Sequence, residues 1–412
     1  MVHPRVQALT DQGQSIWQDD IARAMLTSGA LARTIDEVGI RGLTSNPTIF
    51  EKAISGGSDY DAQIAESIAA GLSAAETFEA LEIADLQAAC DLFRPLYDAT
   101  NGHDGFCSIE VFPDAARDAD ATREQTRRLW ASVNRPNLMV KIPGTVEGAP
   151  VIKEMIAAGI NINVTLLFSL EAYERVAWAF VEGLEIRQAA GKTVSGIASV
   201  ASFFVSRVDA LVDKLLDEKI AVDPANAARY EALKGKIAVA NAKLAYEKFG
   251  EIFQSERFTA LRNAGAQPQR PLWASTGTKN PAYPDTLYVD TLIGPDTVNT
   301  MPSKTIEAFL DHGTVARTVD VDLDLAHQQM DDRRRRDRYR GCHQPARGRG
   351  HRVLHQVVRF PARRRRGQKG PTVARLVNRN QLPERDFACL IKQVRIATSA
   401  LSVSPSWEKT WR

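Results

Sequence analysis

Short apolar runs alternate with helix-like segments along the first 302 residues of the chain. The segments between the runs place apolar residues three and four positions apart, as in Val208, Leu211, Val212, Leu215 and Leu216, which is the spacing of an amphipathic helix. Most of the runs end on a polar residue, which is unusual for a buried strand. The eight runs are SIWQD (15–19), RGLTSN (41–46), FCSIE (106–110), NLMVK (137–141), NINVT (161–165), GIASVAS (196–202), PLWAS (271–275) and a weaker DTVNTMP (296–302).

This alternation predicts an α/β protein with a parallel sheet. Eight strand–helix units in about 300 residues fit a closed (β/α)₈ TIM barrel, and an open doubly wound sheet is the competing architecture. The intervals 46–110 and 202–275 are long, and their periodicity predicts extra helices. In a barrel, the polar residues that end the strands converge on one mouth, which is where such folds carry their active sites.

The run NLMVK raises the question of why a buried strand ends on Lys141. One interpretation is that the long side chain extends to water from the end of the strand. The alternative is chemical, because loss of water around an amine disfavours its ammonium form. The neutral amine can then attack a ketone and form a Schiff base. The other strand ends favour this second interpretation.

An imine mechanism needs groups that carry protons, and carboxylates suit this role. Asp19 and Glu110 end two of the runs, so in a barrel they point into the same cavity as Lys141. Thr165 could position a water between the amine and Glu110. A structural alternative for Asp19 and its neighbour Asp20 is that they cap a helix. The amides available to substrate hydroxyls are those of Asn46 and Asn163.

Two further segments suit a phosphate group. Arg207 lies in the first turn of a predicted helix, where Ser206 and Asp209 have the spacing of a capping box. The positive end of a helix together with a guanidinium suits an anion. The loop ASTGTKN adds Ser275 and Lys279 at the same rim. Together these residues predict a site for a phosphorylated sugar.

The composition, with 44% hydrophobic and 25% charged residues, is that of a globular protein, and no apolar run approaches the length of about 18 residues that crosses a bilayer. The amino terminus lacks the features of a secretory signal, so we expect a cytoplasmic protein that does not bind membranes. Four widely separated cysteines indicate reduced thiols, and no histidine cluster predicts a metal site.

The charge is divided very unevenly. Residues 333–412 hold 22 Lys and Arg but four Asp and Glu, a net charge of +18, so residues 1–332 carry −16 of the total of +2. From Tyr339 through Pro383 there is no acidic residue. We therefore expect two parts, a barrel over 1–332 and an Arg-rich tail over 333–412.

The sequence resembles the transaldolase family in its longer bacterial form, within the class I aldolase superfamily. The resemblance covers about residue 10 to about 332 and rests on six motifs in the family's order. These are LTSNPTIFEKAI from Leu43, SIEV from Ser108, VKIPGT from Val140, GININVTLLFS from Gly159, ASFFVSRVDALVD from Ala201 and WASTGTKN from Trp273.

The resemblance implies a (β/α)₈ barrel whose Schiff-base lysine, here Lys141, lies on the fourth strand, with no metal or organic cofactor. It implies transfer of a dihydroxyacetone unit from sedoheptulose 7-phosphate to glyceraldehyde 3-phosphate in the pentose phosphate pathway. Asp19 would deprotonate the C4 hydroxyl, and Glu110 with Thr165 would serve a water relay. The implied substrate contacts are Asn46, Asn163 and Ser202 for the dihydroxyacetone part and Arg207, Ser275 and Lys279 for the phosphate. A homodimer is a further expectation.

A related branch cleaves fructose 6-phosphate as a simple aldolase and tends to carry an amide in place of Glu110, so the resemblance favours transfer. The tail departs from the family, because apolar spacing through Met330 is followed by Arg333 and Arg334. Three interpretations compete: a nucleic-acid-binding arm on an inactive barrel, a disordered appendage, and an out-of-frame translation, which we favour. We expect this ending to lower solubility and turnover.

Overall fold

The computed structural model describes residues 2–339 and contains a closed barrel of eight parallel strands. Each strand pairs with the next one in the sequence, and β8 returns to pair with β1. The predicted (β/α)₈ barrel is confirmed, and the open sheet is wrong. The strands are β1 (Gln14–Gln18), β2 (Gly42–Thr44), β3 (Phe106–Glu110), β4 (Leu138–Pro143), β5 (Ile162–Leu167), β6 (Ser199–Phe204), β7 (Arg270–Ala274) and β8 (Thr297–Met301).

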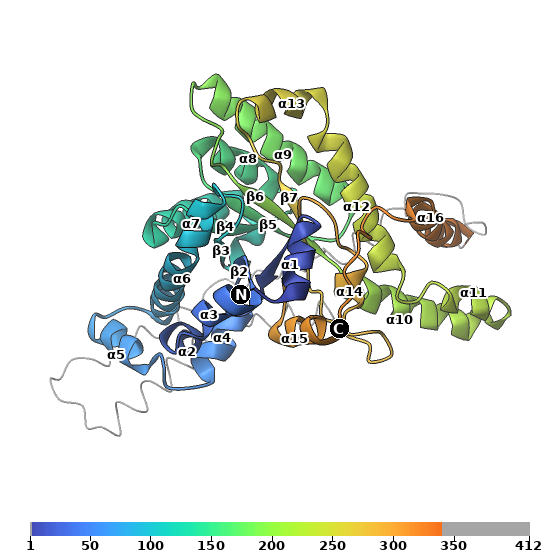
Figure 1. The fold of residues 1–412 in the computed structure, drawn as a ribbon, viewed down its shortest axis with the longest axis horizontal. Helices are drawn as coiled ribbons and strands as arrows, with labels where there is room; N and C mark the ends of the chain where they lie inside the picture. The colour runs from blue at the N-terminus through green and yellow to red at the C-terminus, as the bar shows by residue number, and fades with distance from the viewer. Residues whose placement is uncertain (1, 340–412) are drawn as a thin grey trace, which may run out of the picture.

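Helices surround these strands on the outside (Figure 1). The extra helices expected in the two long intervals are α4 to α6 and α10 to α13. The helices are α1 (Pro4–Asp11), α2 (Arg23–Thr27), α3 (Ala30–Arg33), α4 (Pro47–Ser55), α5 (Asp61–Ala69), α6 (Ala74–Ala99), α7 (Ala119–Val133), α8 (Gly148–Ala158), α9 (Leu170–Ala189), α10 (Ser206–Val222), α11 (Ala227–Glu231), α12 (Ile237–Phe253), α13 (Glu256–Asn263), α14 (Leu287–Asp290), α15 (Ser303–His312) and α16 (Leu323–Tyr339), with short helical turns η1 (Thr34–Val38), η2 (Pro113–Arg117) and η3 (Pro224–Asn226).

Successive side chains of each strand point alternately into the barrel and toward the surrounding helices, so every strand contributes to two separate apolar cores. The outward-facing residues pack under the helices. The inward-facing residues fill the centre of the barrel with a separate apolar cluster, which closes it to solvent. This inner cluster consists of Trp17, Phe106, Met139, Ala198, Val200, Leu272, Ala274 and Val298. Above and below it, toward the two ends of the barrel, the inward-facing residues become polar.

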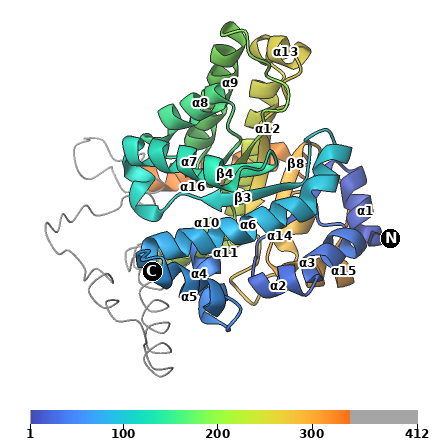
Figure 2. The same ribbon diagram turned by 90° about the vertical axis from the view of Figure 1, so that its left-hand side faces the viewer.

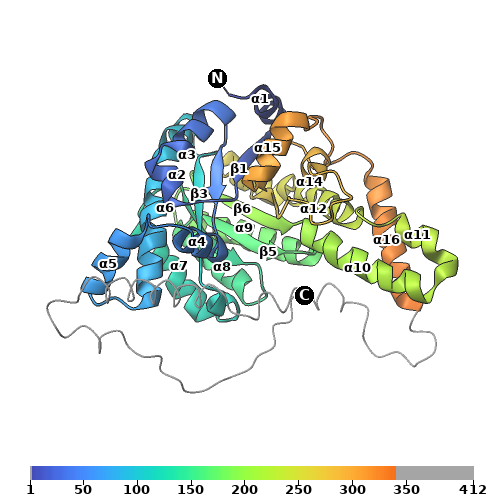
Figure 3. The ribbon, with the colours of Figure 1, turned by 90° about the horizontal axis from the view of Figure 1, so that it is seen from below.

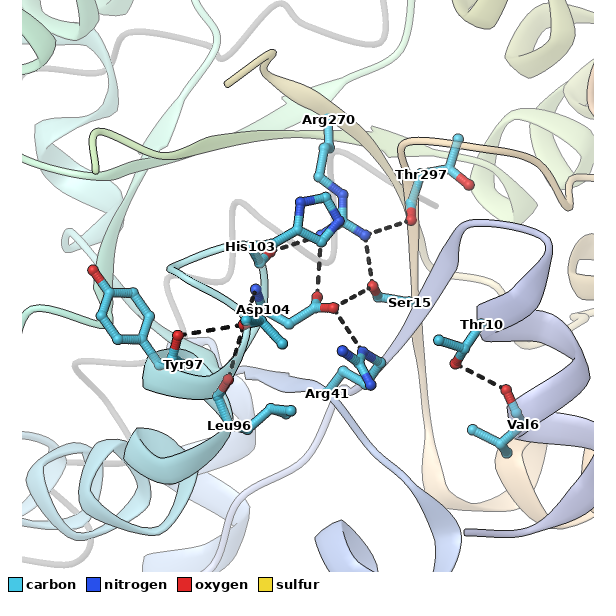
Figure 4. A network of polar contacts seen from close by, with 11 residues as sticks. Val6, Thr10, Ser15, Arg41, Leu96, Tyr97, His103, Asp104, Arg270 and Thr297 are labelled. Atoms are coloured by element: carbon cyan, nitrogen blue, oxygen red, sulfur yellow. Dashed lines mark hydrogen bonds and ion pairs between the residues drawn. The ribbon is translucent and has the colours of Figure 1, made fainter. Parts of the chain in front are cut away.

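A buried ion network fills the amino-terminal end of the barrel (Figure 4). Asp104 lies between two guanidiniums, with Arg41 Nε at 2.6 Å and Arg270 Nη1 at 3.1 Å from its oxygens. Arg270 also donates to Ser15 Oγ at 2.6 Å and to the Thr297 carbonyl at 2.8 Å. Burial alone would raise the pKa of Asp104, but the two guanidiniums outweigh it and hold the pKa below its usual range.

The first and the last helices of the described chain complete the outer layer of the barrel. α1 lies beside α15 (Figures 2 and 3), and α16 packs on α12, where Ala326 and Met330 are buried. α16 continues to Tyr339, past the expected boundary at 332/333, and residues 340–412 lie outside the described part. The boundary and the expectations about the tail therefore stay predictions.

Within residues 2–339, no helix combines the length and the apolar character needed to cross a membrane. Cys90 and Cys107 are buried free thiols. The other two cysteines of the sequence, Cys342 and Cys389, lie beyond the described residues.

Candidate active site

Lys141 lies inside the barrel on β4, with 6% of its surface exposed, so the interpretation that it reaches out to water is wrong. Its Nζ is 3.1 Å from Glu110 Oε2 and donates to the Ser45 carbonyl at 3.3 Å. Lys141 and Glu110 are direct partners in the pairing of β4 with β3. The register of the sheet therefore brings the predicted nucleophile and the predicted proton carrier together.

This contact has a chemical consequence. An ion pair between Lys141 and Glu110 contains both a proton donor and its acceptor, so one proton shift along the 3.1 Å contact gives a neutral amine beside a neutral acid. Such an amine can attack a carbonyl, and the acid beside it can protonate the departing oxygen. The pair therefore equips the site for imine chemistry.

Thr165 lies on β5 next to an irregularity in the sheet. The register of β5 with β6 shifts between Val164 and Leu167, and Leu166 has a φ of 61°, in the left-handed region that non-glycine residues seldom adopt. Bulges of this kind redirect side chains near active sites. Thr165 Oγ1 is buried and has no hydrogen-bond partner within residues 2–339. It is therefore free to hydrogen-bond the water expected between the Lys141 amine and Glu110.

Asp19 follows β1 directly, and its Oδ1 accepts a hydrogen bond of 2.7 Å from Thr44 Oγ1. Its backbone N–H donates to the Met301 carbonyl, which continues the ladder between β1 and β8. The alternative that Asp19 and Asp20 cap a helix is wrong, because α2 starts after Ala22 and has no side-chain cap. The Asp19 carboxylate is therefore available for chemistry.

The three amide and hydroxyl residues expected to hold substrate divide into two groups. Ser202 Oγ donates to Asn163 Oδ1 at 2.7 Å, and Asn163 Nδ2 donates to Ser108 Oγ at 3.0 Å, all buried. Asn46 instead caps α4, accepting from the Ile49 N–H at 3.1 Å, so its NH₂ group is the part left to donate to a ligand.

The expected phosphate residues gather where α10 meets the loop after β7. Ser275 has a φ of 58° and its hydroxyl is 3.0 Å from that of Ser206. Burial lowers the pKa of Arg207, and burial followed by the Arg207 charge lowers that of Lys279, while the Asp19 carboxylate opposes both shifts. Two neighbouring cations whose charged forms are disfavoured make a site that an anion stabilises.

The capping box expected at Ser206 is wrong. α10 begins at Ser206 itself and lacks a side-chain cap, and Asp209 reaches elsewhere. Its Oδ1 accepts from the Ala238 N–H at 2.7 Å and its Oδ2 from Tyr288 Oη at 2.9 Å. Asp209 therefore ties α10 to α12 and to the segment after the loop that holds Lys279.

Burial raises the pKa of Asp209 from 3.8 to about 6. A raised folded value means that the stability from this group is full below 3.8 and is lost as pH rises through about 6. Compared with Asp209→Asn, which does not titrate, the unsubstituted chain should lose about 2 kcal/mol of unfolding free energy between pH 4 and 7. Denaturant unfolding of both chains across this range measures it, and a constant difference between them would contradict the assignment.

Three polar residues of the mouth escaped the sequence reasoning. Thr44 lies two residues before Asn46, Ser108 lies two before Glu110, and Thr300 lies in the weakest of the eight runs. Residues two apart on a strand face the same way, so counting back by two from each expected site residue would have found the first two. Thr300 offered no such signal.

Comparison with known proteins gives one consistent result. The model of the Transaldolase/Fructose-6-phosphate aldolase family matches residues 16–339. A transaldolase of Trichodesmium erythraeum is 49% identical over 334 residues, which is 81% of this chain and 88% of that protein. A transaldolase of Thermobifida fusca is 52% identical over 327 residues, which is 79% of this chain and 87% of that protein. Transaldolase 2 of a Nostoc species is 48% identical over 326 residues, which is 78% of this chain and 86% of that protein.

Proposed function

Because the chain belongs to the transaldolase/fructose-6-phosphate aldolase family, we propose that it is a transaldolase. It transfers a dihydroxyacetone unit from sedoheptulose 7-phosphate to glyceraldehyde 3-phosphate, which yields erythrose 4-phosphate and fructose 6-phosphate. The buried contact between Lys141 Nζ and Glu110 is the single observation that carries the proposal, because it places an amine and a proton carrier side by side in a barrel mouth.

In the first half of the reaction, the Lys141 amine adds to the C2 carbonyl of the ketose, and Glu110 with Thr165 and a water protonates the oxygen that leaves as water. The product is an iminium ion on Nζ. Asp19 then takes the proton of the C4 hydroxyl, the C3–C4 bond breaks, and its electron pair moves into the iminium to give an enamine. The aldehyde formed from C4 onward departs.

In the second half, the enamine carbon attacks the aldehyde carbon of glyceraldehyde 3-phosphate. Asp19 returns its proton to the new hydroxyl oxygen, and water releases the ketose from Lys141. The chain Ser202–Asn163–Ser108 and the Asn46 amide hold the dihydroxyacetone part. Its retention between the two halves is what distinguishes a transferase from a plain aldolase.

Arg207, Ser275 and Lys279 bind the phosphate in this proposal. The lowered pKa of both cations supports it, since an anion held between them offsets the burial that lowers both pKa values and the Arg207 charge that further lowers the pKa of Lys279. We place the reaction in the non-oxidative pentose phosphate pathway and in the cytoplasm, and propose a homodimer, in keeping with the resemblance to the family.

The test is product formation by the full chain. With sedoheptulose 7-phosphate and glyceraldehyde 3-phosphate together, fructose 6-phosphate and erythrose 4-phosphate should accumulate, as measured by chromatography with mass detection. With fructose 6-phosphate alone, free dihydroxyacetone should form at under about a hundredth of the transfer rate. Cleavage as fast as transfer would assign the chain to the aldolase branch instead.

A further inference from the structure

Two buried threonines connect to the candidate base Asp19 through a chain of hydroxyl groups. Thr44 Oγ1 is 2.7 Å from Asp19 Oδ1 and 2.6 Å from Thr300 Oγ1. Thr44 and Thr300 are 1% and 3% exposed. They come from β2 and β8, the two strands that flank β1, so the chain of hydroxyls crosses the end of the strand that carries Asp19.

The direction of these hydrogen bonds follows from proton counting. A carboxylate only accepts, and a threonine hydroxyl has one proton to donate. When Asp19 is ionised, the Thr44 proton points to Asp19, so the bond between the two threonines must use the proton of Thr300. The order is therefore Thr300 to Thr44 to Asp19, and Thr300 prevents Thr44 from turning its proton away.

We propose that Thr44 and Thr300 are positioning residues for carbon–carbon bond cleavage, holding Asp19 so that Oδ2 faces the C4 hydroxyl; this rests on the proposed function. Oδ1 is occupied by Thr44, which leaves Oδ2 as the oxygen that takes the proton. A hydrogen bond to a charged group fixes the carboxylate more firmly than a neutral one would. Holding the base within reach of its proton is a substantial part of its rate effect.

The chain also reaches the proposed phosphate loop. Thr276 follows Ser275 directly, and its Oγ1 donates to the Thr300 carbonyl at 2.9 Å. The strand that supplies Thr300 is therefore tied to the segment that supplies Ser275. Through these contacts, the loop expected to hold the far end of the sugar phosphate also sets the place of the base.

The experiment separates formation of the Schiff base, which needs Lys141, from cleavage, which needs Asp19. Full-length Thr44→Val, which keeps the shape but lacks the hydroxyl, is incubated with sedoheptulose 7-phosphate and borohydride, and the adducts are read by intact mass. The adduct should shift from dihydroxyacetone to the uncleaved seven-carbon sugar phosphate. The kcat of transfer should fall about 10- to 100-fold at nearly unchanged KM.

Three further variants complete the test. Thr44→Ser restores the hydroxyl and should return kcat to within about 3-fold of the original, while Thr300→Val should lower it about 3- to 10-fold. Thr126→Val is the matched control, because Thr126 is equally buried but lies in α7, a helix outside the barrel, where it donates to the Thr122 carbonyl of the same helix. It should change kcat less than about 2-fold.

Two results would overturn the inference. One is an unchanged adduct ratio and kcat in Thr44→Val, and the other is a parallel fall of both adducts with no return in Thr44→Ser, which indicates a purely structural role. If the unsubstituted chain forms no adduct with the ketose, the proposed function itself fails, and that outcome is distinct from both.

Discussion

Lys141→Met is expected to abolish the borohydride-trapped adduct and to lower the rate of transfer by about 10⁵-fold or more, since the reaction loses its covalent intermediate. Methionine matches the length of the lysine stem but has no amine. Intact-mass measurement after incubation with sedoheptulose 7-phosphate and borohydride, together with a product assay, checks both parts. Lys153→Met is the control, because Lys153 pairs with Glu182 on the surface and should leave both readouts unchanged.

Loss of the amine also leaves Glu110 buried without its partner, so Lys141→Met alone could act through the fold. Lys141→Arg separates the two effects. The guanidinium keeps a positive charge near Glu110 but is not nucleophilic, so folding is retained and trapping is lost. An adduct that persists in Lys141→Arg would place the Schiff base on another lysine and remove the main support for the proposed mechanism.

Asp104→Asn should destabilise the barrel by about 3–5 kcal/mol at pH 7, since it leaves Arg270 buried without a counter-charge. The midpoint of denaturant unfolding measures this loss. Asp98→Asn breaks an exposed pair with Arg94, where both side chains are about half accessible, and should change stability by less than about 1 kcal/mol. Equal effects of the two substitutions would contradict the structural role assigned to the buried network.

Asp104→Asn should also change how the stability of the protein depends on pH. The pKa of Asp104 is lower in the folded protein than its ordinary value of 3.8. The stability from a depressed carboxyl is present above the unfolded value and lost as pH falls through the folded value. The difference between the original chain and Asp104→Asn should therefore be full at neutral pH and shrink below about pH 3.8. Replacing Asp104 and Arg270 together, as Asp104→Leu with Arg270→Met, should recover part of the stability, because the remaining cation, Arg41, is 23% exposed and keeps access to water.

The barrel could be predicted from the sequence because its signals are local. Each strand is a short apolar run, each helix has its own periodicity, and eight repeats of one unit leave few ways to pack. Lys141, Asp19 and Glu110 could also be recognised locally. Burying a charged residue at the end of a strand costs free energy unless the charge is paired, so its presence there indicates a functional role. The capping box predicted at Ser206 was wrong because the Asp209 carboxylate can bond either within its own helix or to another element, and the sequence does not distinguish the two. In the structure it accepts hydrogen bonds from α12 and from Tyr288.

The sequence by itself thus determined the fold class, the strands and the identity of the charged residues in the mouth. Only the tertiary structure decided which atoms meet: the direct contact of Lys141 with Glu110, the hydroxyl chain from Thr300 to Asp19, and the ion network at the opposite end of the barrel. The physical reason is that these contacts join strands far apart in the chain, and their distances depend on the register and closure of the sheet. Periodicity along one segment carries no information about either.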